Sequence, residues 1–359
     1  MKKYLSLIIL TLLSLSCECQ DSSTLGFSKN VFSLALERTK AFQLNYTDAK
    51  KDLLEIAKEP HPLGSSRQRD VANYLALRAR DYGLETYEES FTVDTPNPNL
   101  NSSPIIKKTG INVFIKPKHS TSYDCTILVG SHYDTKILPN TAYLGANDSG
   151  SSSILLLQII KYASEIFKDL NTKQTCGILG VFFDGEEAQL LEWDDSRRHH
   201  PSKILDNTYG SRFLAGQLSP CNYLGKKAKC LPFNHGGNAL IAFILLDMVG
   251  SKNIKISEDS LSTPFLFTLM KKFASTQKPE KDIFDTKQTI FDDHQPFLQS
   301  GVFAIDIIDF NHLDNWHREG DDISNISFES IELAGRLAIP LIFSLAIEPK
   351  VFLAHADHK

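Results

Sequence analysis

The stretch that decides the fold is GILGVFFDGEE at residues 177–187, a continuous apolar run that ends in an acidic cluster. Two other runs have the same form, TILVGSHYD at residues 126–134 and ALIAFILLD at residues 239–247. Apolar runs without alternation are typical of strands that are buried on both faces, as in a parallel sheet. A fourth apolar run at residues 302–308 extends the series.

The segments around these runs carry apolar residues at helical spacing. We expect helices at residues 48–56, 67–82, 154–167, 209–215, 261–274 and 328–347. Two further strands are expected at residues 91–93 and 111–116, separated by a loop rich in Pro and Asn at residues 95–103. Strands that alternate with helices predict an α/β fold, with one globular domain and a central, mostly parallel mixed sheet flanked by helices.

Polar residues follow the apolar runs directly. His132 and Asp134 follow the first run, Glu186 and Glu187 follow the second, and Asp247 ends the third. In an open α/β sheet, the edge formed by the carboxyl ends of the strands is where ligands bind. The sequence therefore predicts a functional site at this edge.

Two more residues add metal-binding chemistry to that edge. Asp148 lies in the loop GANDSG at residues 145–150, and His317 follows Trp316 in a polar segment after the fourth run. Asp, Glu and His are ligands that Zn²⁺ accepts while one coordination position stays open. No short-range zinc motif such as HExxH is present, so the prediction depends on shared position. The alternatives are solvated loop carboxylates and an Asp148 that caps a helix.

Composition excludes several classes of protein. The chain has 359 residues, of which 42% are hydrophobic and 23% charged, and this balance argues against intrinsic disorder. The formal net charge of −5 provides no basic excess to neutralise phosphates, so we expect no nucleic-acid partner.

The N-terminus has the pattern of a secretory signal. Lys2 and Lys3 precede an apolar run at residues 5–15 that is too short to span about 30 Å of hydrocarbon. We expect a signal peptide at residues 1–19, a domain at residues 30–359, secretion and no membrane span, since no later apolar stretch is expected to reach membrane length. A buried N-terminal helix and a lipoprotein signal ending at Cys17 are the alternatives.

Cysteine usage fits an oxidising compartment. Four cysteines follow the signal region, and they allow three pairings that sequence alone cannot distinguish: Cys125, Cys176, Cys221 and Cys230. Cys125 and Cys176 each open an apolar run, so a bridge between strands is conceivable. Cys221 and Cys230 flank a short basic loop that a disulfide could close. Three triplets would suit N-glycosylation, at Asn45, Asn101 and Asn325.

The ordered set of motifs resembles glutaminyl-peptide cyclotransferases, also called glutaminyl cyclases. The motifs are GSHYDTK (130–136), GANDS (145–149), FFDGEEA (182–188), Trp193, YGSR (209–212), LLD (245–247), DDHQPF (292–297) and Trp316-His317. The resemblance as a whole runs in order from about residue 35 to residue 347. These enzymes share their fold with co-catalytic zinc aminopeptidases, so the resemblance implies a zinc aminopeptidase-like fold.

The resemblance also implies an activity and the residues that carry it. The expected reaction converts the N-terminal glutamine of peptides or proteins to pyroglutamate and releases ammonia, with one Zn²⁺ per chain. The implied zinc ligands are Asp148, Glu187 and His317. Glu186 matches the general acid/base, with Asp247 and Asp292 assisting it. Trp193 and Trp316 match walls of the substrate pocket, and His132 and Asp134 match supports behind the ligands. A monomer is expected.

The chain departs from the animal secreted enzymes at three positions. Asp306 stands where those enzymes carry a His in the fourth strand. Ser131 stands where they carry a Cys, and no cysteine partner is present near Ser153. The main alternative function is a secreted zinc aminopeptidase in which His132 and Asp134 would hold a second zinc. An inactive secreted binding protein is a further alternative.

Overall fold

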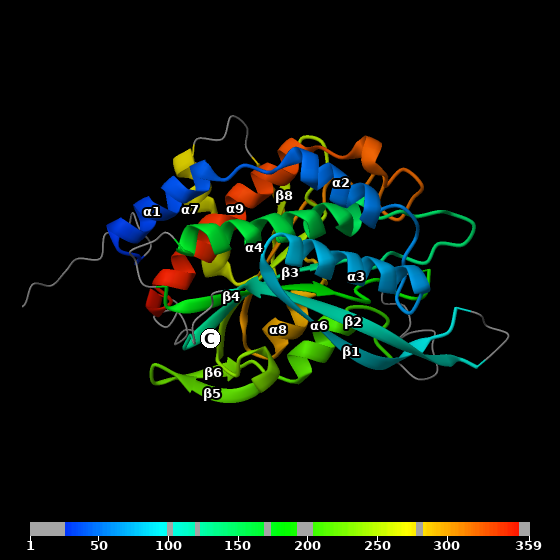
Figure 1. Cartoon of the computed structure of the whole chain (residues 1–359), viewed down its shortest axis with the longest axis horizontal. Coiled ribbons are helices and arrows are strands. Elements are labelled where there is room, and N and C mark those ends of the chain that lie inside the picture. Colours follow the sequence, from blue (N-terminus) through cyan, green and yellow to red (C-terminus); the bar gives the residue numbers. More distant parts are fainter. Residues whose placement is uncertain are drawn as a thin grey trace, which may run out of the picture.

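Eight strands form one mixed sheet in the computed structural model, which describes residues 26–98, 103–118, 123–168, 174–191, 204–277 and 283–351 (Figure 1). The strands are β1 (Leu84–Pro96), β2 (Ile105–Pro117), β3 (Cys125–His132), β4 (Cys176–Phe183), β5 (Ser219–Tyr223), β6 (Lys226–Cys230), β7 (Ala239–Asp247) and β10 (Phe303–Ile308). Their order is β1-β2-β4-β3-β7-β6-β5, and β10 pairs with β7 as well. Two more strands, β8 (Ile256–Asp259) and β9 (Phe284–Gln288), form a separate small sheet.

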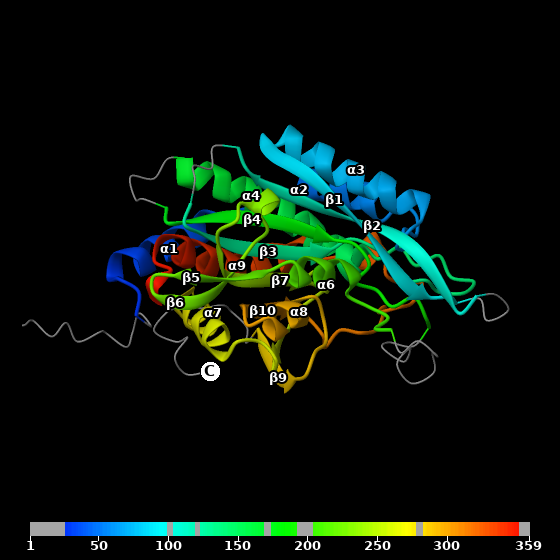
Figure 2. The same cartoon turned by 90° about the horizontal axis from the view of Figure 1, so that it is seen from below.

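The four strands predicted from continuous apolar runs form the parallel centre of the sheet. β4, β3, β7 and β10 run parallel to one another and lie side by side in Figure 2. β2 joins β4 and β6 joins β7 in the antiparallel sense. The predicted single α/β domain with a mostly parallel mixed sheet at its centre is confirmed.

Helices cover both faces of the sheet (Figure 1). One face carries α1 (Lys29–Ala41), α2 (Tyr46–Ile56), α3 (Ser66–Asp81), α4 (Ser152–Lys168) and α9 (Phe328–Ile347). The opposite face carries α6 (Tyr209–Gly216) and α8 (His294–Gln299), while α7 (Pro264–Gln277) packs against α9. All six predicted helices are present, with ends shifted by up to three residues.

The second face of the sheet is packed by aromatic rings, and this packing places α8. Phe183 of β4 contacts Phe243 of β7 edge-on at 5.9 Å between ring centroids. Phe297 of α8 lies 4.5 Å from Phe243 and 6.1 Å from Phe183. Because all three rings are buried, α8 is fixed against the sheet, and the acidic residues just before it are held near the strand ends.

One expectation about membrane-length stretches was wrong. By length and composition, α9 could cross a membrane, although no later apolar stretch was expected to do so. In the fold, 83% of its apolar window is buried inside the protein, as in the core helix of a globular domain.

The four cysteines form two disulfides. Cys125 and Cys176 are direct partners in the register of β3 and β4 and are bonded to each other, and Cys221 is bonded to Cys230 across β5 and β6. Both bridges are among those that the sequence allowed. The hydroxyl oxygens of Ser131 and Ser153 lie 3.4 Å apart. These two serines are therefore neighbours at the positions where the resemblance to the animal enzymes implies a pair of cysteines.

Several predicted features fall on residues that the structure does not describe. The signal peptide at residues 1–19, the glycosylation triplet at Asn101 and the pocket residue Trp193 all lie outside the described ranges.

Candidate metal centre and acidic pocket

The polar residues that follow the parallel strands meet at one edge of the sheet, as predicted. His132 ends β3, Glu186 and Glu187 follow β4, and Asp247 ends β7. Their side chains are buried, with at most 5% of the surface of each residue exposed. Ionisable groups are buried at this density mainly where they bind a ligand or a metal or take part in catalysis.

Three side chains from separate loops converge on one point. Nε2 of His317 lies 3.2 Å from both carboxylate oxygens of Glu187 and 3.5 Å from Oδ2 of Asp148. One ligand atom from each residue lies within 4.8 Å of the others, a spacing that suits a bound cation. The donor set fits Zn²⁺, and Oε2 of Glu187 is buried without a hydrogen bond from any described residue. We call Asp148, Glu187 and His317 the first triad.

The loop that carries Asp148 needs glycine at its start. Gly145 has a φ of 62°, and a Cβ atom there would lie 2.5 Å from the carbonyl oxygen of Asp148. Glycine is the residue that fits such a close approach of backbone to backbone. The small residues of the GANDSG motif therefore allow the Asp148 carboxylate to reach the strand ends.

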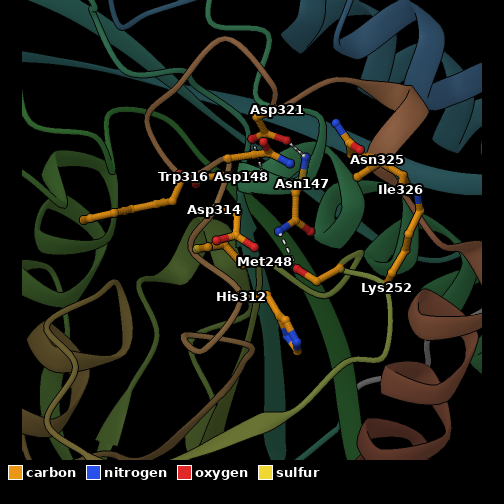
Figure 3. A pocket seen from close by; sticks show the side chains of 12 residues that line it. Asn147, Asp148, Met248, Lys252, His312, Asp314, Trp316, Asp321, Asn325 and Ile326 are labelled. Carbon is orange, nitrogen blue, oxygen red and sulfur yellow. Dashed lines mark hydrogen bonds between the residues drawn. The ribbon is translucent and has the colours of Figure 1, made fainter.

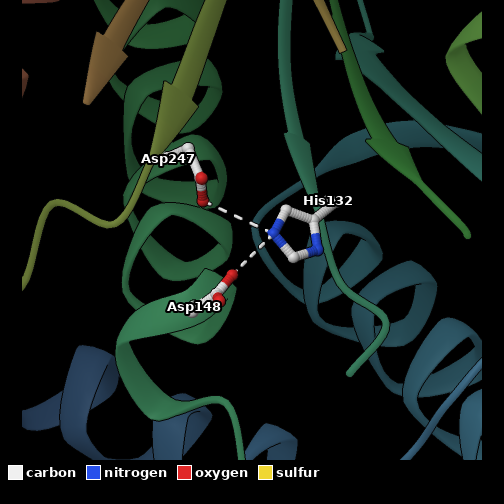
Figure 4. Close-up of side chains that lie close together, drawn as sticks. All are labelled: His132, Asp148 and Asp247. Carbon is white, nitrogen blue, oxygen red and sulfur yellow. Dashed lines mark hydrogen bonds and ion pairs between the residues drawn. The ribbon is translucent and has the colours of Figure 1, made fainter. Parts of the chain in front are cut away.

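A second triad shares Asp148 with the first (Figure 4). Nε2 of His132 lies 3.0 Å from Oδ1 of Asp148 and 3.4 Å from Oδ1 of Asp247. For the alternative peptidase, His132 and Asp134 were expected to hold a second metal ion. Among the described residues, the group spaced for a second cation is His132, Asp148 and Asp247, while Asp134 lies on the Nδ1 side of the His132 ring.

Asp134 instead holds the loop after β4. Its two carboxylate oxygens accept hydrogen bonds from the backbone N–H groups of Glu186 at 2.9 Å and Glu187 at 3.3 Å. It also lies 3.5 Å from Nδ1 of His132. One buried carboxylate thus orients both glutamates and one side of the histidine ring, in the manner of outer partners that orient metal ligands.

A cavity of about 170 Å³ opens beside the two triads. Its polar wall is formed by Asp148, Glu186, Asp247, Asp292 and His317. The rest of the lining is mostly apolar and comprises Met248, Thr289, Ile290, Phe291, Ile308, Phe310 and Trp316. We call this cavity the acidic pocket. Its few convergent polar groups in an apolar surround are typical of a small-ligand site.

Glu186 and Asp292 of the acidic pocket bind protons more tightly than isolated carboxyl groups do. Against the effect of burial, in contrast, contact with His132 lowers the pKa of Asp148. Burial raises the pKa of Glu186 well above its ordinary value, and the charges of Asp292 and Glu187 add to the effect. Burial likewise raises the pKa of Asp292 well above its ordinary value, together with the charges of Asp247 and Asp293. Since like charges at short range cannot all ionise, the pocket holds protons at a pH where isolated carboxylates do not.

Trp316 forms one wall of the acidic pocket and packs on the first triad. Its ring stacks on that of His317, with centroids 4.1 Å apart and planes 23° apart, and it meets Phe310 edge-on at 5.5 Å. This stacking fixes the orientation of the His317 ring toward Asp148 and Glu187.

Sequence reasoning missed four residues that support the site. The Tyr143 hydroxyl donates to Oδ2 of Asp148 at 2.8 Å, and Asp321 accepts the backbone N–H groups of Asn147 and Asp148. The Ser211 hydroxyl donates to Asp293, and His294 contacts Asp259 at 3.1 Å. Tyr143 and Asp321 lie in loops without periodicity and gave no signal, whereas Ser211 lies in the YGSR motif and His294 in the DDHQPF motif of the resemblance.

Asp306 lies in the middle of β10 and is fully buried. Neither of its carboxylate oxygens has a hydrogen-bond partner among the described residues, and Nδ1 of His294 is 4.0 Å away. Burial raises the pKa of Asp306 well above its ordinary value, and the charges of Asp292 and Asp247 raise it further. This position, where the animal enzymes carry a histidine, therefore favours the neutral acid.

Comparison with known proteins identifies the superfamily. Residues 112–342 match the family described as peptidase family M28, and they make up more than half of the chain. The chain belongs to peptidase family M28. The match begins in β2 and includes both triads, every strand of the parallel centre and most of α9.

Within this family, the chain is similar to glutaminyl cyclases. It is 26% identical over 314 residues to a glutaminyl-peptide cyclotransferase of Dictyostelium discoideum, covering 79% of this chain and 82% of the relative. The solved structure of an Acidobacteriales bacterium glutaminyl cyclase shares the fold with a TM-score of 0.62 and 23% identity, over 90% of this chain and 96% of that one. A leucine aminopeptidase precursor of Bacteroides thetaiotaomicron shares the fold with a TM-score of 0.60 and 22% identity, over 84% and 98%. The resemblance to glutaminyl cyclases of the M28 superfamily is confirmed.

Proposed function

We propose that this chain is a zinc-dependent glutaminyl-peptide cyclotransferase that converts N-terminal glutamine to pyroglutamate and releases ammonia. The observation that carries the proposal is the first triad placed at the wall of the acidic pocket, directly beside Glu186, a buried carboxyl group with a raised pKa. The similarity to glutaminyl-peptide cyclotransferases supports the same reaction.

The reaction makes two demands on the protein. The α-amine must attack the amide carbon of its own side chain, and this intramolecular step already has an effective molarity of the order of 10⁵ M or more. The amine, however, is largely protonated at neutral pH, and ammonia is a poor leaving group. The site must therefore accept a proton from the amine and return one to the departing nitrogen.

Asp148, Glu187 and His317 would hold the zinc ion. When bound, zinc supplies Lewis-acid chemistry that polarises the side-chain amide carbonyl. The histidine and the two carboxylates are kept in place by contacts with Trp316, Tyr143 and the Asp134-anchored loop.

Glu186 is the group we assign to proton transfer. It lines the acidic pocket, and its carboxyl group is buried with a raised pKa, so it can accept the proton of the amine and later donate one to the leaving nitrogen. Asp247 and Asp292 line the same pocket and would hold the nitrogen groups of the substrate. No attacking water is required, which distinguishes this reaction from peptide hydrolysis.

The second triad is the observation that favours the alternative, a zinc aminopeptidase with two metal ions. His132, Asp148 and Asp247 are spaced for a second cation, and the solved leucine aminopeptidase precursor shares the fold. A bridging water between two metals would then be the nucleophile. The two functions differ in product, so a single pair of substrates separates them.

The test is incubation of the purified protein with a peptide that begins with glutamine and with a matched peptide that begins with leucine. We expect ammonia release from the glutamine peptide in step with pyroglutamate formation, loss of this activity with a chelator, and its return with zinc. Release of free leucine from the matched peptide, with the glutamine peptide unchanged, would establish the peptidase instead.

We also infer that the protein acts as a secreted monomer. The N-terminal signal pattern and the two disulfides support secretion, because disulfides persist in oxidising compartments. Glycosylation at Asn45 and Asn325 is part of the same prediction, and intact mass of the protein from a eukaryotic secretory host tests it.

A further inference from the structure

A second cavity, of about 200 Å³, adjoins the acidic pocket (Figure 3). The two cavities share Asp148, Met248 and Trp316 in their walls. In Figure 3 the Trp316 side chain points away from the other labelled residues, and its ring packs on His317 and Phe310 in the acidic pocket. The second cavity therefore begins where the wall of the acidic pocket ends. We call it the polar cavity.

The lining of the polar cavity differs in chemistry from that of the acidic pocket. No phenylalanine in the described part of the chain lines the polar cavity, and its wall contains Ser251, Lys252, His312, Asp314 and Asn315 together with the apolar Met248, Trp316 and Ile326. Polar and charged linings select ligands by hydrogen bonds and charge, whereas apolar walls select by shape. The polar cavity is thus suited to a peptide backbone with polar side chains.

Lys252 is the positively charged group of this cavity that can meet a ligand. It is exposed, and its ammonium group makes one long hydrogen bond, 3.4 Å, to the carbonyl oxygen of Ser324. His312 is already engaged, with Nδ1 2.7 Å from Oδ2 of Asp309. Asp314 is exposed and lies nearer Trp316 in Figure 3, across the cavity from Lys252.

We propose that the polar cavity binds the residues that follow the N-terminal glutamine of a peptide substrate, and that Lys252 recognises an acidic side chain there. The inference rests on the proposed function. In a peptide substrate, only the N-terminal glutamine occupies the acidic pocket. The second residue of the peptide then lies at the wall that the two cavities share. Since consecutive Cα atoms are about 3.8 Å apart, the second and third residues come within reach of the adjoining cavity.

The size of the expected selectivity follows from the exposure of Lys252 and Asp314 to solvent. An exposed ion pair between Lys252 and a substrate carboxylate changes the binding constant by about two- to fivefold. Three carboxyl groups in the same lining, those of Asp148, Asp314 and Asp321, oppose the substrate carboxylate and keep the effect of Lys252 small. The effect belongs to KM rather than to kcat, because the contact is made equally in the bound substrate and in the transition state.

The test compares kcat/KM for five peptides that differ only after the glutamine: Gln-Ala-Ala, and four versions with either Glu or Lys at either the second or the third position. Lys252→Glu should turn a preference for Glu over Lys into the reverse, through KM. Lys287→Glu is the matched control. Lys287 is an exposed lysine on β9, just before residues Thr289 to Phe291 of the opposite wall of the acidic pocket.

A second variant should change the preference between Glu and Lys in the opposite direction. Asp314→Asn should raise the preference for Glu by about twofold, since it removes one opposing charge. The proposal fails if Lys252→Glu leaves the Glu-to-Lys ratio unchanged, or if Lys287→Glu changes it by as much. If all variants cyclise Gln-Ala-Ala and none of them distinguishes Glu from Lys after the glutamine, the proposed subsite is overturned but the proposed function stands. No cyclisation of Gln-Ala-Ala by the native protein would overturn the proposed function, and the subsite with it.

Discussion

At the scale of single residues, Glu186 is the side chain that we propose for proton transfer. Glu186→Gln keeps the size and the hydrogen-bonding shape of the side chain but cannot exchange a proton. We expect kcat to fall by at least about 10²-fold. Steady-state kinetics measure this loss, and zinc content and thermal unfolding should match those of the native protein.

A control for Glu186→Gln comes from a glutamate far from the site. Glu85 on β1 is partly exposed and pairs with Lys116. Glu85→Gln should leave kcat unchanged. Native turnover in Glu186→Gln would refute the acid/base assignment, whatever the control shows.

Asp306 makes a second residue-scale prediction, about stability and pH. Its folded-state pKa is raised by burial and by neighbouring carboxylates, so its contribution to stability is fully present below the unfolded pKa and is lost as pH rises. The Asp306→Asn variant has no carboxyl group at this position, so it does not lose this stability as the pH rises. We expect the variant to be more stable than the native protein at pH 8 by at least about 1.4 kcal/mol, the free energy that corresponds to a pKa raised by one unit.

The matching measurement is urea unfolding of both proteins at pH 5 and pH 8. The stability difference should shrink at the lower pH, where Asp306 is more fully protonated in the folded state. A difference that stays constant or grows at pH 5 would contradict the assignment of a neutral acid at this position.

At the scale of elements, the two disulfides differ in the length of chain that they close. Cys125 and Cys176 are 51 residues apart, whereas Cys221 and Cys230 are 9 apart. In the loop-entropy account, the longer loop stabilises by about 4 kcal/mol and the shorter by about 2.5 kcal/mol. The bridge between β3 and β4 should therefore matter more for stability.

The comparison uses two double variants, Cys125→Ala with Cys176→Ala, and Cys221→Ala with Cys230→Ala. Urea unfolding should show the larger loss of free energy for the first pair, which also joins two central strands. An equal or larger loss for the second pair would show that loop length does not govern these bridges.

What the sequence could predict at this scale depended on the length and apolarity of each segment. β3, β4, β7 and β10 were predictable because strands covered on both faces need continuous apolar runs. α8 has six residues, and β5, β6, β8 and β9 are four or five residues long, so none of them carries a periodic signal. β1 and β2 have 13 residues each, far more than expected, because antiparallel pairing extends beyond their buried centres.

At the scale of the whole molecule, the site could be predicted in part because parallel strands end at one edge. That rule placed His132, Glu186, Glu187 and Asp247 together. The rule does not say which of these residues bind the same metal ion. Asp247 completes the second triad with His132 and Asp148, whereas Asp134 accepts the backbone N–H groups of Glu186 and Glu187 behind the His132 ring. Tyr143 and Asp321 were missed because they reach Asp148 from loops.

The two triads also define the central question about the whole molecule. They share Asp148, so the chain has the spacing for one metal ion or for two. The cyclisation that we propose uses a single zinc ion at the first triad, whereas hydrolysis by a bridging water would need a metal ion at both triads.

The measurement that tests this most directly is a zinc titration of the metal-stripped protein, with glutamine-peptide cyclisation followed at each addition. The account predicts that activity rises linearly and reaches its plateau at one equivalent of zinc per chain. A plateau reached only at two equivalents, or full activity in the stripped protein, would contradict it.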